Sequence, residues 1–252
     1  MENQSQSDGL KVRIPNVDLE LALVYSGCRK PYPQDLVKRV SELHQLLQET
    51  AEPKSCWKLC RLNFTDQEVE LEDGQILLRG TLASKMLAGS THAVLMAGTL
   101  SMSFDRMLHQ LQIRNPADAL LFDSLGSSAV ESVIDETEAE IKRQLPEYEL
   151  LQRFSCGYGD LPLELQKDLF RMLDLNRRCG IYLSDSLMMN PTKSITAIAG
   201  LKEIKRGKEN PEECAENQAL RDRHSKENCL ECSMKESCIY SEAKSVRKEP
   251  EN

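Results

Sequence analysis

Apolar residues recur along the chain with two different periods. Between Asp35 and Gln48, leucines and valines return at intervals of three and four residues, which predicts an amphipathic helix. The stretch 92–100 is an almost continuous apolar run of strand length, which predicts a buried strand. Asn115 followed by Pro116 is a cap-then-proline signal, and it begins a long predicted helix that reaches Leu145. Gly126 interrupts this helix pattern, and a close contact with another helix would explain a glycine there.

The remaining segments also divide into helices and strands. We expect strands at 56–64, 69–72, 76–78, 181–183 and 194–198, helices at 82–88, 102–113 and 163–173, and an extended segment leading into a short helix at 12–25. Strands and helices do not alternate regularly, and no G-x-G-x-x-G turn follows a strand. The pattern therefore favours an α+β fold over a doubly wound nucleotide-binding fold.

Composition divides the chain into three parts. We expect residues 1–9 to be a disordered leader, residues 10–201 to form the globular domain, and residues 202–252 to be a charged linker with a cysteine-rich C-terminal segment. Gly200 is expected to close the globular domain. The net charge of −8, with one Trp and five Phe, disfavours a nucleic-acid or anionic-membrane surface. Neither a signal peptide nor an apolar run of membrane-spanning length is visible, so we expect a cytoplasmic protein.

The nine cysteines fall into different contexts. Cys28, Cys56, Cys60 and Cys179 stand among apolar or mixed residues, and we expect core thiols there rather than redox thiols. Four others lie in the polar C-terminal segment, where a thiol has little apolar surface to pack against: Cys214, Cys229, Cys232 and Cys238. Four thiolates suit Zn²⁺ or a [4Fe-4S] cluster, so we predict a metal site, with a redox dithiol or a flexible tail as the alternatives.

Arg153, Gly157 and Tyr158 form the pattern R-x-x-x-G-Y. An arginine fork pairs bidentately with a carboxylate, and glycine allows the backbone to approach a ligand. Taken singly, these residues have ordinary explanations: Arg153 as a surface ion pair with Glu149 or Asp160, and Tyr158 as a half-buried core residue. Glu131 and Glu147, taken alone, would be solvated helix charges.

A ligand-binding role for this turn is supported by a later segment, L-S-x-S at 183–186 followed by M-x-P-x-x-S at 189–194. Together they resemble the activation (reactivation) domain of cobalamin-dependent methionine synthase, over roughly residues 10–201 and most closely over 147–200. The resemblance implies an α+β fold with a mixed or antiparallel twisted sheet and flanking helices. It also implies that S-adenosylmethionine is bound by Arg153, Gly157, Tyr158, Glu147 and Glu131.

The resemblance further implies a function. A stand-alone reactivation subunit would support reductive methylation of a cobalamin carried by a partner chain, either a methionine synthase core or another corrinoid protein. The electron would come from a flavodoxin- or ferredoxin-like donor. This transfer needs no general base, and we expect no catalytic side chain. The chain is too short for the other synthase modules, and none of its four His stands in a D-x-H-x-x-G context. The alternatives are a non-catalytic adaptor of a corrinoid methyltransferase and a metal or redox sensor that uses the C-terminal cysteines.

Overall fold

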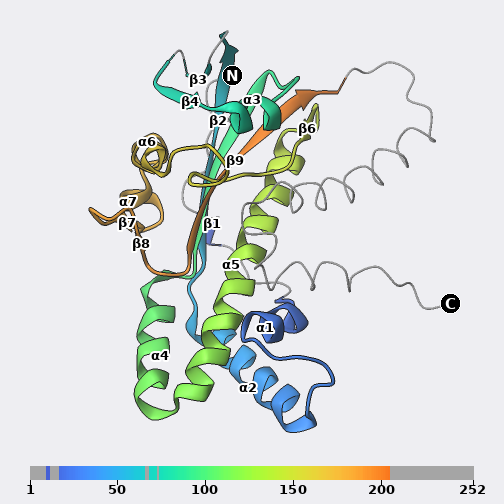
Figure 1. Cartoon of the computed structure of the whole chain (residues 1–252), viewed down its shortest axis with the longest axis vertical. Coiled ribbons are helices and arrows are strands. Elements are labelled where there is room, and N and C mark those ends of the chain that lie inside the picture. Colours follow the sequence, from blue (N-terminus) through green and yellow to red (C-terminus); the bar gives the residue numbers. More distant parts are fainter. Residues whose placement is uncertain (1–9, 12–16, 66–67, 73, 205–252) are drawn as a thin grey trace, which may run out of the picture. The chain divides into compact units, whose positions relative to one another are not determined.

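The structure is a computed structural model that describes residues 10–11, 17–65, 68–72 and 74–204. Within this part, a seven-stranded antiparallel sheet runs in the order β4-β3-β2-β5-β9-β6, with β1 also paired to β2 (Figure 1). Its strands are β1 (Leu10–Lys11), β2 (Lys54–Phe64), β3 (Glu68–Leu71), β4 (Ile76–Arg79), β5 (His92–Thr99), β6 (Tyr148–Leu150) and β9 (Ser194–Glu203). The expected α+β fold is confirmed.

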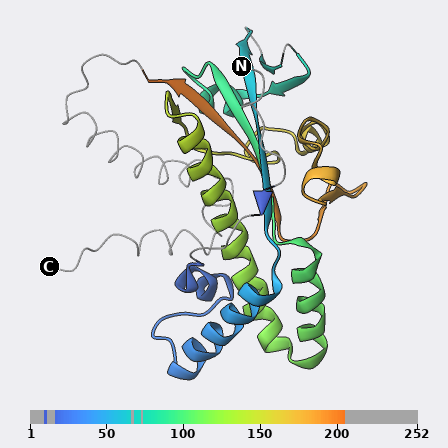
Figure 2. The same cartoon turned by 180° about the vertical axis from the view of Figure 1, so that it is seen from behind.

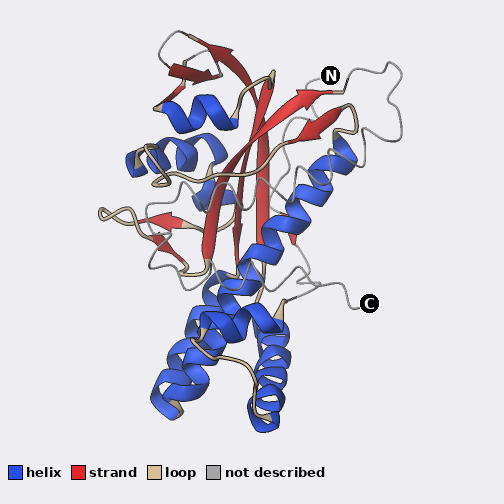
Figure 3. Cartoon of the chain, turned by 45° about the vertical axis from the view of Figure 1, so that its right-hand side comes forward, coloured by secondary structure: helices blue, strands red, loops and turns tan. Residues whose placement is uncertain are grey.

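Helices cover both faces of this sheet and extend beyond one end of it (Figures 1 and 3). They are α1 (Leu19–Tyr25), α2 (Gln34–Thr50), α3 (Thr81–Met86), α4 (Ser101–Arg114), α5 (Pro116–Gln144), the 3₁₀ helix η1 (Leu163–Leu165), α6 (Gln166–Leu173) and α7 (Leu175–Arg178). A small hairpin of β7 (Tyr182–Leu183) and β8 (Met189–Asn190) stands apart from the main sheet. No helix in the described part is long and apolar enough to cross a membrane.

The centre of the sheet is formed by β2, β5 and β9. Every β5 residue after His92 is buried, as the apolar run predicts, because both of its faces are covered. The expectation that Gly200 closes the domain is wrong: β9 continues through it to Glu203. Gly200 serves close packing instead, because a Cβ there would overlap Ser90 Oγ and lie 3.2 Å from Leu151 Cδ1. The boundary between the two compact units of the chain follows Glu203.

Helix α5 links the sheet to a helical lobe, as seen from both sides in Figures 1 and 2. Its start is fixed as predicted: the Asn115 side chain accepts hydrogen bonds from the Ala117 and Asp118 backbone amides, and Pro116 follows the cap. The N-terminal half of α5 packs with α1, α2 and α4, whereas Ile134 and Ile141 in its second half pack on the sheet. Gly98 on β5 permits this contact, since a Cβ there would lie 2.9 Å from Val133 Cγ1.

The glycine inside α5 is explained by a neighbouring helix, as expected. Phe104 of α4 is fully buried and stacks on Phe122 of α5, with ring centroids 4.8 Å apart. Gly126 lies against the edge of the Phe104 ring, and a Cβ at this position would overlap Phe104 Cζ and lie 2.8 Å from Cε2. The missing side chain therefore sets how closely α4 approaches α5.

The face of the sheet opposite α5 packs on α3 and α6 and forms a second core. This core contains most of the cysteines that were expected to be core thiols. Cys56 and Cys60 of β2 and Cys179 after α7 are buried there, so the expectation of core thiols is confirmed for these three. Cys28 departs from it. This residue is half-buried at the margin of the helical lobe, because the Ser26 turn at the end of α1 holds it beside a polar hydroxyl rather than inside the core.

An ion pair between Asp118 of α5 and Arg39 of α2 makes the stability of the helical lobe depend on pH. Arg39 donates to both carboxylate oxygens of Asp118, at 2.8 and 2.5 Å, and these bonds hold the pKa of Asp118 below its usual value. A carboxylate with a depressed pKa stabilises the fold above its unfolded pKa, and this stability is lost as the pH falls through the folded pKa. We therefore expect Asp118→Asn to lower the free energy of unfolding by about 1–2 kcal/mol at pH 7, allowing for the half-exposed Arg39.

Urea denaturation at pH 7 and at pH 3 would test this. The gap between wild type and Asp118→Asn should shrink at the lower pH, because Asp118 is protonated in the unfolded chain there and the stability that comes from its depressed folded pKa is progressively lost. Glu42→Gln is the matched control, because Glu42 also pairs with Arg39 but is 49% exposed. It should cost less than about 0.5 kcal/mol. A gap that widens on acidification would contradict the assignment.

Candidate functional site

The backbone before the predicted site turn contains a one-residue bulge. Strand β6 pairs regularly with β9, and Leu151 continues this register by donating to the Gly200 carbonyl at 2.8 Å. Phe154 then pairs with Ile198, so Gln152 and Arg153 together oppose the single residue Ala199. A bulge of this kind re-aims the side chains that follow it. Tyr148 and Leu150 pack on the face of the sheet that α5 covers. Regular alternation from these residues would direct the Arg153 side chain to the opposite face. The extra residue of the bulge directs it to the α5 face instead, where it pairs with Glu131.

Arg153 is held by three carboxylates of α5. Its Nη2 lies 2.8 Å from Glu131 Oε2, and its Nη1 lies 2.8 Å from Asp135 Oδ1 and 2.7 Å from Glu138 Oε1. Glu131, Asp135 and Glu138 follow one another at intervals of four and three residues, so they share one helix face. We call these four residues the Arg153 clamp. It joins the edge of the sheet to the helix that crosses the sheet.

The clamp is only partly open to water. The Arg153 side chain is 26% exposed, and Glu138 at 18% is the most enclosed of the carboxylates. Burial alone would lower the pKa of Arg153, but the charges and hydrogen bonds of Glu138 and Asp135 outweigh it and raise this pKa. The guanidinium is therefore a permanent cation with a fixed orientation.

The turn after Arg153 is closed by backbone hydrogen bonds. Gly157, with φ of 83°, donates to the Leu161 carbonyl at 2.9 Å, and Leu161 donates to the Tyr158 carbonyl at 3.1 Å. Gly157 is required twice, because its φ favours glycine and because a Cβ would lie 3.1 Å from Leu163 Cδ1. Tyr158 is displayed at the tip with 38% of its surface exposed.

Asp160 anchors this turn to the start of α3. Its carboxylate accepts hydrogen bonds from the Thr81 amide at 2.6 Å, the Thr81 hydroxyl at 2.8 Å and the Leu82 amide at 3.0 Å. The two backbone bonds, followed by the hydroxyl, lower the pKa of Asp160. A residue from the predicted site turn thus provides the cap that α3 lacks in its own sequence, since Gly80 precedes the helix.

The predicted site residues are partly brought together. Of the two glutamates, Glu131 pairs directly with Arg153, as expected of a residue in the same site. Glu147 is exposed in the turn between α5 and β6 and is not among the ion-pair partners of Arg153 in the described part of the chain. Asp135 and Glu138 were not expected at the site. Their signal was the acidic spacing along α5, which is also typical of a solvated helix face.

The later segment of the resemblance mainly positions the chain. Ser184 holds the β7–β8 turn, because its hydroxyl accepts from the Met188 amide at 3.0 Å. Beyond the hairpin, Thr192 donates from its amide and hydroxyl to Asp105 of α4, at 2.9 and 2.7 Å. Ser194 donates to the Pro191 carbonyl at 2.7 Å, and Lys193 pairs with Asp123 of α5 at 2.9 Å. These contacts fix the entry into β9, the strand that pairs with the bulged segment at Gln152 and Arg153.

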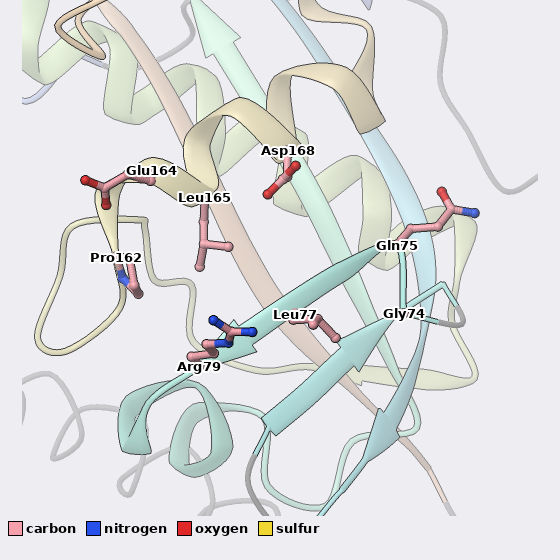
Figure 4. Close-up of a pocket in the computed structure, with 8 residues that line it drawn as sticks. All are labelled: Gly74, Gln75, Leu77, Arg79, Pro162, Glu164, Leu165 and Asp168. Carbon is pink, nitrogen blue, oxygen red and sulfur yellow. The ribbon is translucent and has the colours of Figure 1, made fainter.

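A separate open pocket of about 410 Å³ lies between β4 and α6 (Figure 4). Its walls are Gly74, Gln75, Leu77, Arg79, Pro162, Glu164, Leu165 and Asp168. None of the site residues expected within the described part of the chain lines it. The four C-terminal cysteines lie outside the described residues. Within those residues, no group of three or more His, Cys, Asp or Glu side chains is arranged to hold a metal ion.

Comparison with known proteins identifies the fold. No protein-family model matches the chain, and no curated protein matches it in sequence. A solved structure described as the MetH reactivation domain bound to AdoHcy matches with a TM-score of 0.60. The match covers 81% of this chain and 80% of that chain, at 13% sequence identity.

The chain is therefore an α+β protein whose antiparallel sheet is flanked by helices in the manner of a reactivation domain. More particularly, its fold is that of the MetH reactivation domain, as the sequence resemblance led us to expect. At 13% identity the likeness concerns the fold, and function is argued separately.

Proposed function

We propose that this chain is a reactivation subunit that binds S-adenosylmethionine and supports reductive methylation of a corrinoid on a partner protein. The observation that carries the proposal is Arg153, a permanently charged fork fixed at the sheet edge of a fold that a solved relative uses while bound to AdoHcy. The ligand class, the partner and the reaction are inferred from this arrangement together with the resemblance of the R-x-x-x-G-Y turn.

The clamp leaves Arg153 able to bind a ligand. A guanidinium carries five N–H donors, and the clamp takes two from Nη1 and one from Nη2. The Nε–H and the second Nη2–H have no acceptor among the described residues. The atoms Nε and Nη2 lie on one edge of the planar guanidinium, and an edge of this kind receives a carboxylate in a bidentate pair. The α-carboxylate of S-adenosylmethionine fits this edge while the carboxylates of α5 keep the fork in place.

The chain's own residues would act by binding and orientation. Arg153 would hold the amino-acid end, Glu131 would meet the cationic part of the ligand, and the Gly157–Tyr158 turn would form a wall for the adenosine. Glu147 is assigned to the same site by the sequence resemblance alone. The partner's corrinoid, once reduced by one electron, would take the methyl group as a nucleophile and leave S-adenosylhomocysteine. A methionine synthase core is the proposed partner, with a flavodoxin- or ferredoxin-like protein as the electron donor.

Titration calorimetry with S-adenosylmethionine tests the proposal. We expect saturable binding by the wild type and at least about tenfold weaker binding by Arg153→Lys, because lysine keeps the charge but loses the planar fork. Arg143→Lys is the matched control: Arg143 also lies on α5, pairs with Glu140 and is 68% exposed, so its replacement should leave the affinity unchanged. Absence of binding by a folded wild type, alone and with a corrinoid partner, would overturn the proposal.

Two further roles are separable from this one. A non-catalytic adaptor would bind a corrinoid protein but not S-adenosylmethionine. A metal or redox role rests on Cys214, Cys229, Cys232 and Cys238, through Zn²⁺ or a [4Fe-4S] cluster. Metal analysis and absorbance spectra of the wild type, beside a variant with Cys229 and Cys232 changed to Ser, would test it. If ligand binding survives the loss of the metal, the cysteines do not belong to the ligand site.

A further inference from the structure

The Arg153 clamp carries more negative than positive charge. One guanidinium faces three carboxylates, Glu131, Asp135 and Glu138, at distances of 2.7 to 2.8 Å. No second lysine or arginine pairs with any of the three in the part of the chain that the structure describes. A structural tie between a strand edge and a helix needs one carboxylate. The presence of two additional carboxylates on Nη1, from Asp135 and Glu138, is not explained by such a structural role.

A ligand that docks its carboxylate on Arg153 would make this imbalance larger. The ligand carboxylate would add a fourth negative group around one guanidinium, and the excess negative charge of the three α5 carboxylates would then face the rest of the ligand. In S-adenosylmethionine the sulfur lies about 5 Å from the carboxylate, a distance set by four covalent bonds. The sulfur would therefore sit within Coulombic range of the clamp.

From this we infer that Asp135 and Glu138 are specificity residues that make the site prefer the sulfonium of S-adenosylmethionine over the uncharged thioether of S-adenosylhomocysteine. The inference rests on the proposed function and deepens it. Both ligands carry the same carboxylate, ammonium and adenosine, so they differ at this site by the methyl group and the positive charge that it places on sulfur. Transfer of the methyl group removes that charge, and the clamp would then favour release of the product.

The solvent exposure of Glu138 and Asp135 predicts which of them has the larger effect on ligand preference. Glu138 is 18% exposed and Asp135 is 66% exposed, so water and salt screen Asp135 far more. Neutralising Glu138 should lower the preference for the sulfonium ligand by about threefold to tenfold, as expected for one charge at about 5–7 Å in a partly solvated site. Neutralising Asp135 should lower it by less than about threefold.

The experiment is calorimetric titration of both ligands into four full-length chains: wild type, Glu138→Gln, Asp135→Asn and the control Glu140→Gln. Glu140 lies on the same helix, is 24% exposed and pairs with Arg143 rather than Arg153. We expect Glu138→Gln to weaken S-adenosylmethionine binding more than S-adenosylhomocysteine binding, and Glu140→Gln to change neither.

The outcomes separate this inference from the function on which it rests. If Glu138→Gln weakens both ligands by the same factor, Glu138 only orients Arg153 and the specificity role is wrong. If the wild type binds both ligands equally and no variant changes their ratio, the inference also fails while the proposed function stands. If the folded wild type binds neither ligand, alone or with a corrinoid partner, the proposed function fails, and this inference fails with it.

Discussion

Gly126→Val should lower the free energy of unfolding by about 3 kcal/mol or more, because the new side chain has no space to occupy. A Cβ at this position would overlap the Phe104 ring, which is fully buried and held by its stack on Phe122. The ring cannot rotate away without breaking that stack. Helix α4 would have to move from α5, and the helical lobe would lose part of its core.

Gly126→Ala gives a graded control. Alanine gains about 1 kcal/mol of helix propensity over glycine, and this gain offsets part of the same clash. We therefore expect a smaller loss than for valine, measured by urea denaturation. The double variant Gly126→Ala with Phe104→Leu should lose less stability than the sum of the two single losses, because a shorter side chain at 104 leaves room for the methyl group. Additive losses in this cycle would mean that the contact does not explain the glycine.

The long elements could be predicted because their period is unambiguous. Helix α5 was marked at its start by Asn115 and Pro116, and β5 by its unbroken apolar run, and both are found close to the expected bounds. The short elements β1, β6, β8 and α7 were not predicted as separate elements. Each has two to four residues, which is too few to display a period. Their positions depend on pairing with distant strands, which local sequence does not specify.

The site was predictable only in part, for a related reason. The R-x-x-x-G-Y pattern marked Arg153 and the turn, and the resemblance added Glu131. What the pattern could not show is the bulge at Gln152 and Arg153, since it exists only through the register of β6 against β9. The face to which Arg153 points depends on that one extra residue. For the same reason Asp135 and Glu138 were not predicted at the site, because they contact Arg153 only through this register.

The sheet edge and α5 together explain how the site stays fixed while its turn remains exposed. Arg153 is tied to the helix by the clamp, and Asp160 is tied to α3 by three hydrogen bonds. Between these two anchors, Gly157 and Tyr158 are presented to solvent. This arrangement would give the proposed site a preorganised cationic fork and an accessible rim, which is what the proposed docking of a corrinoid partner requires.

The second large effect is expected at Arg178, a buried cation on the opposite face of the sheet. Its Nη1 donates to the Leu173 carbonyl at the end of α6, at 3.1 Å, and its Nη2 donates to the Trp57 carbonyl of β2, at 3.3 Å. Its Nε has no hydrogen-bond partner, and no carboxylate pairs with Arg178 among the described residues. Arg178→Ala would leave a cavity and remove both donors, and we expect a loss of about 3–5 kcal/mol in urea denaturation.

Two comparisons show what Arg178 contributes. Arg177→Ala is the matched control, because its neighbouring side chain is 71% exposed and pairs with Asp174, and it should cost less than about 1 kcal/mol. Arg178→Met should cost clearly less than Arg178→Ala, since methionine fills the volume and removes a buried charge that has no carboxylate beside it. If methionine is as damaging as alanine, the hydrogen bonds to Leu173 and Trp57 hold α6 on the sheet; if it is nearly harmless, packing does.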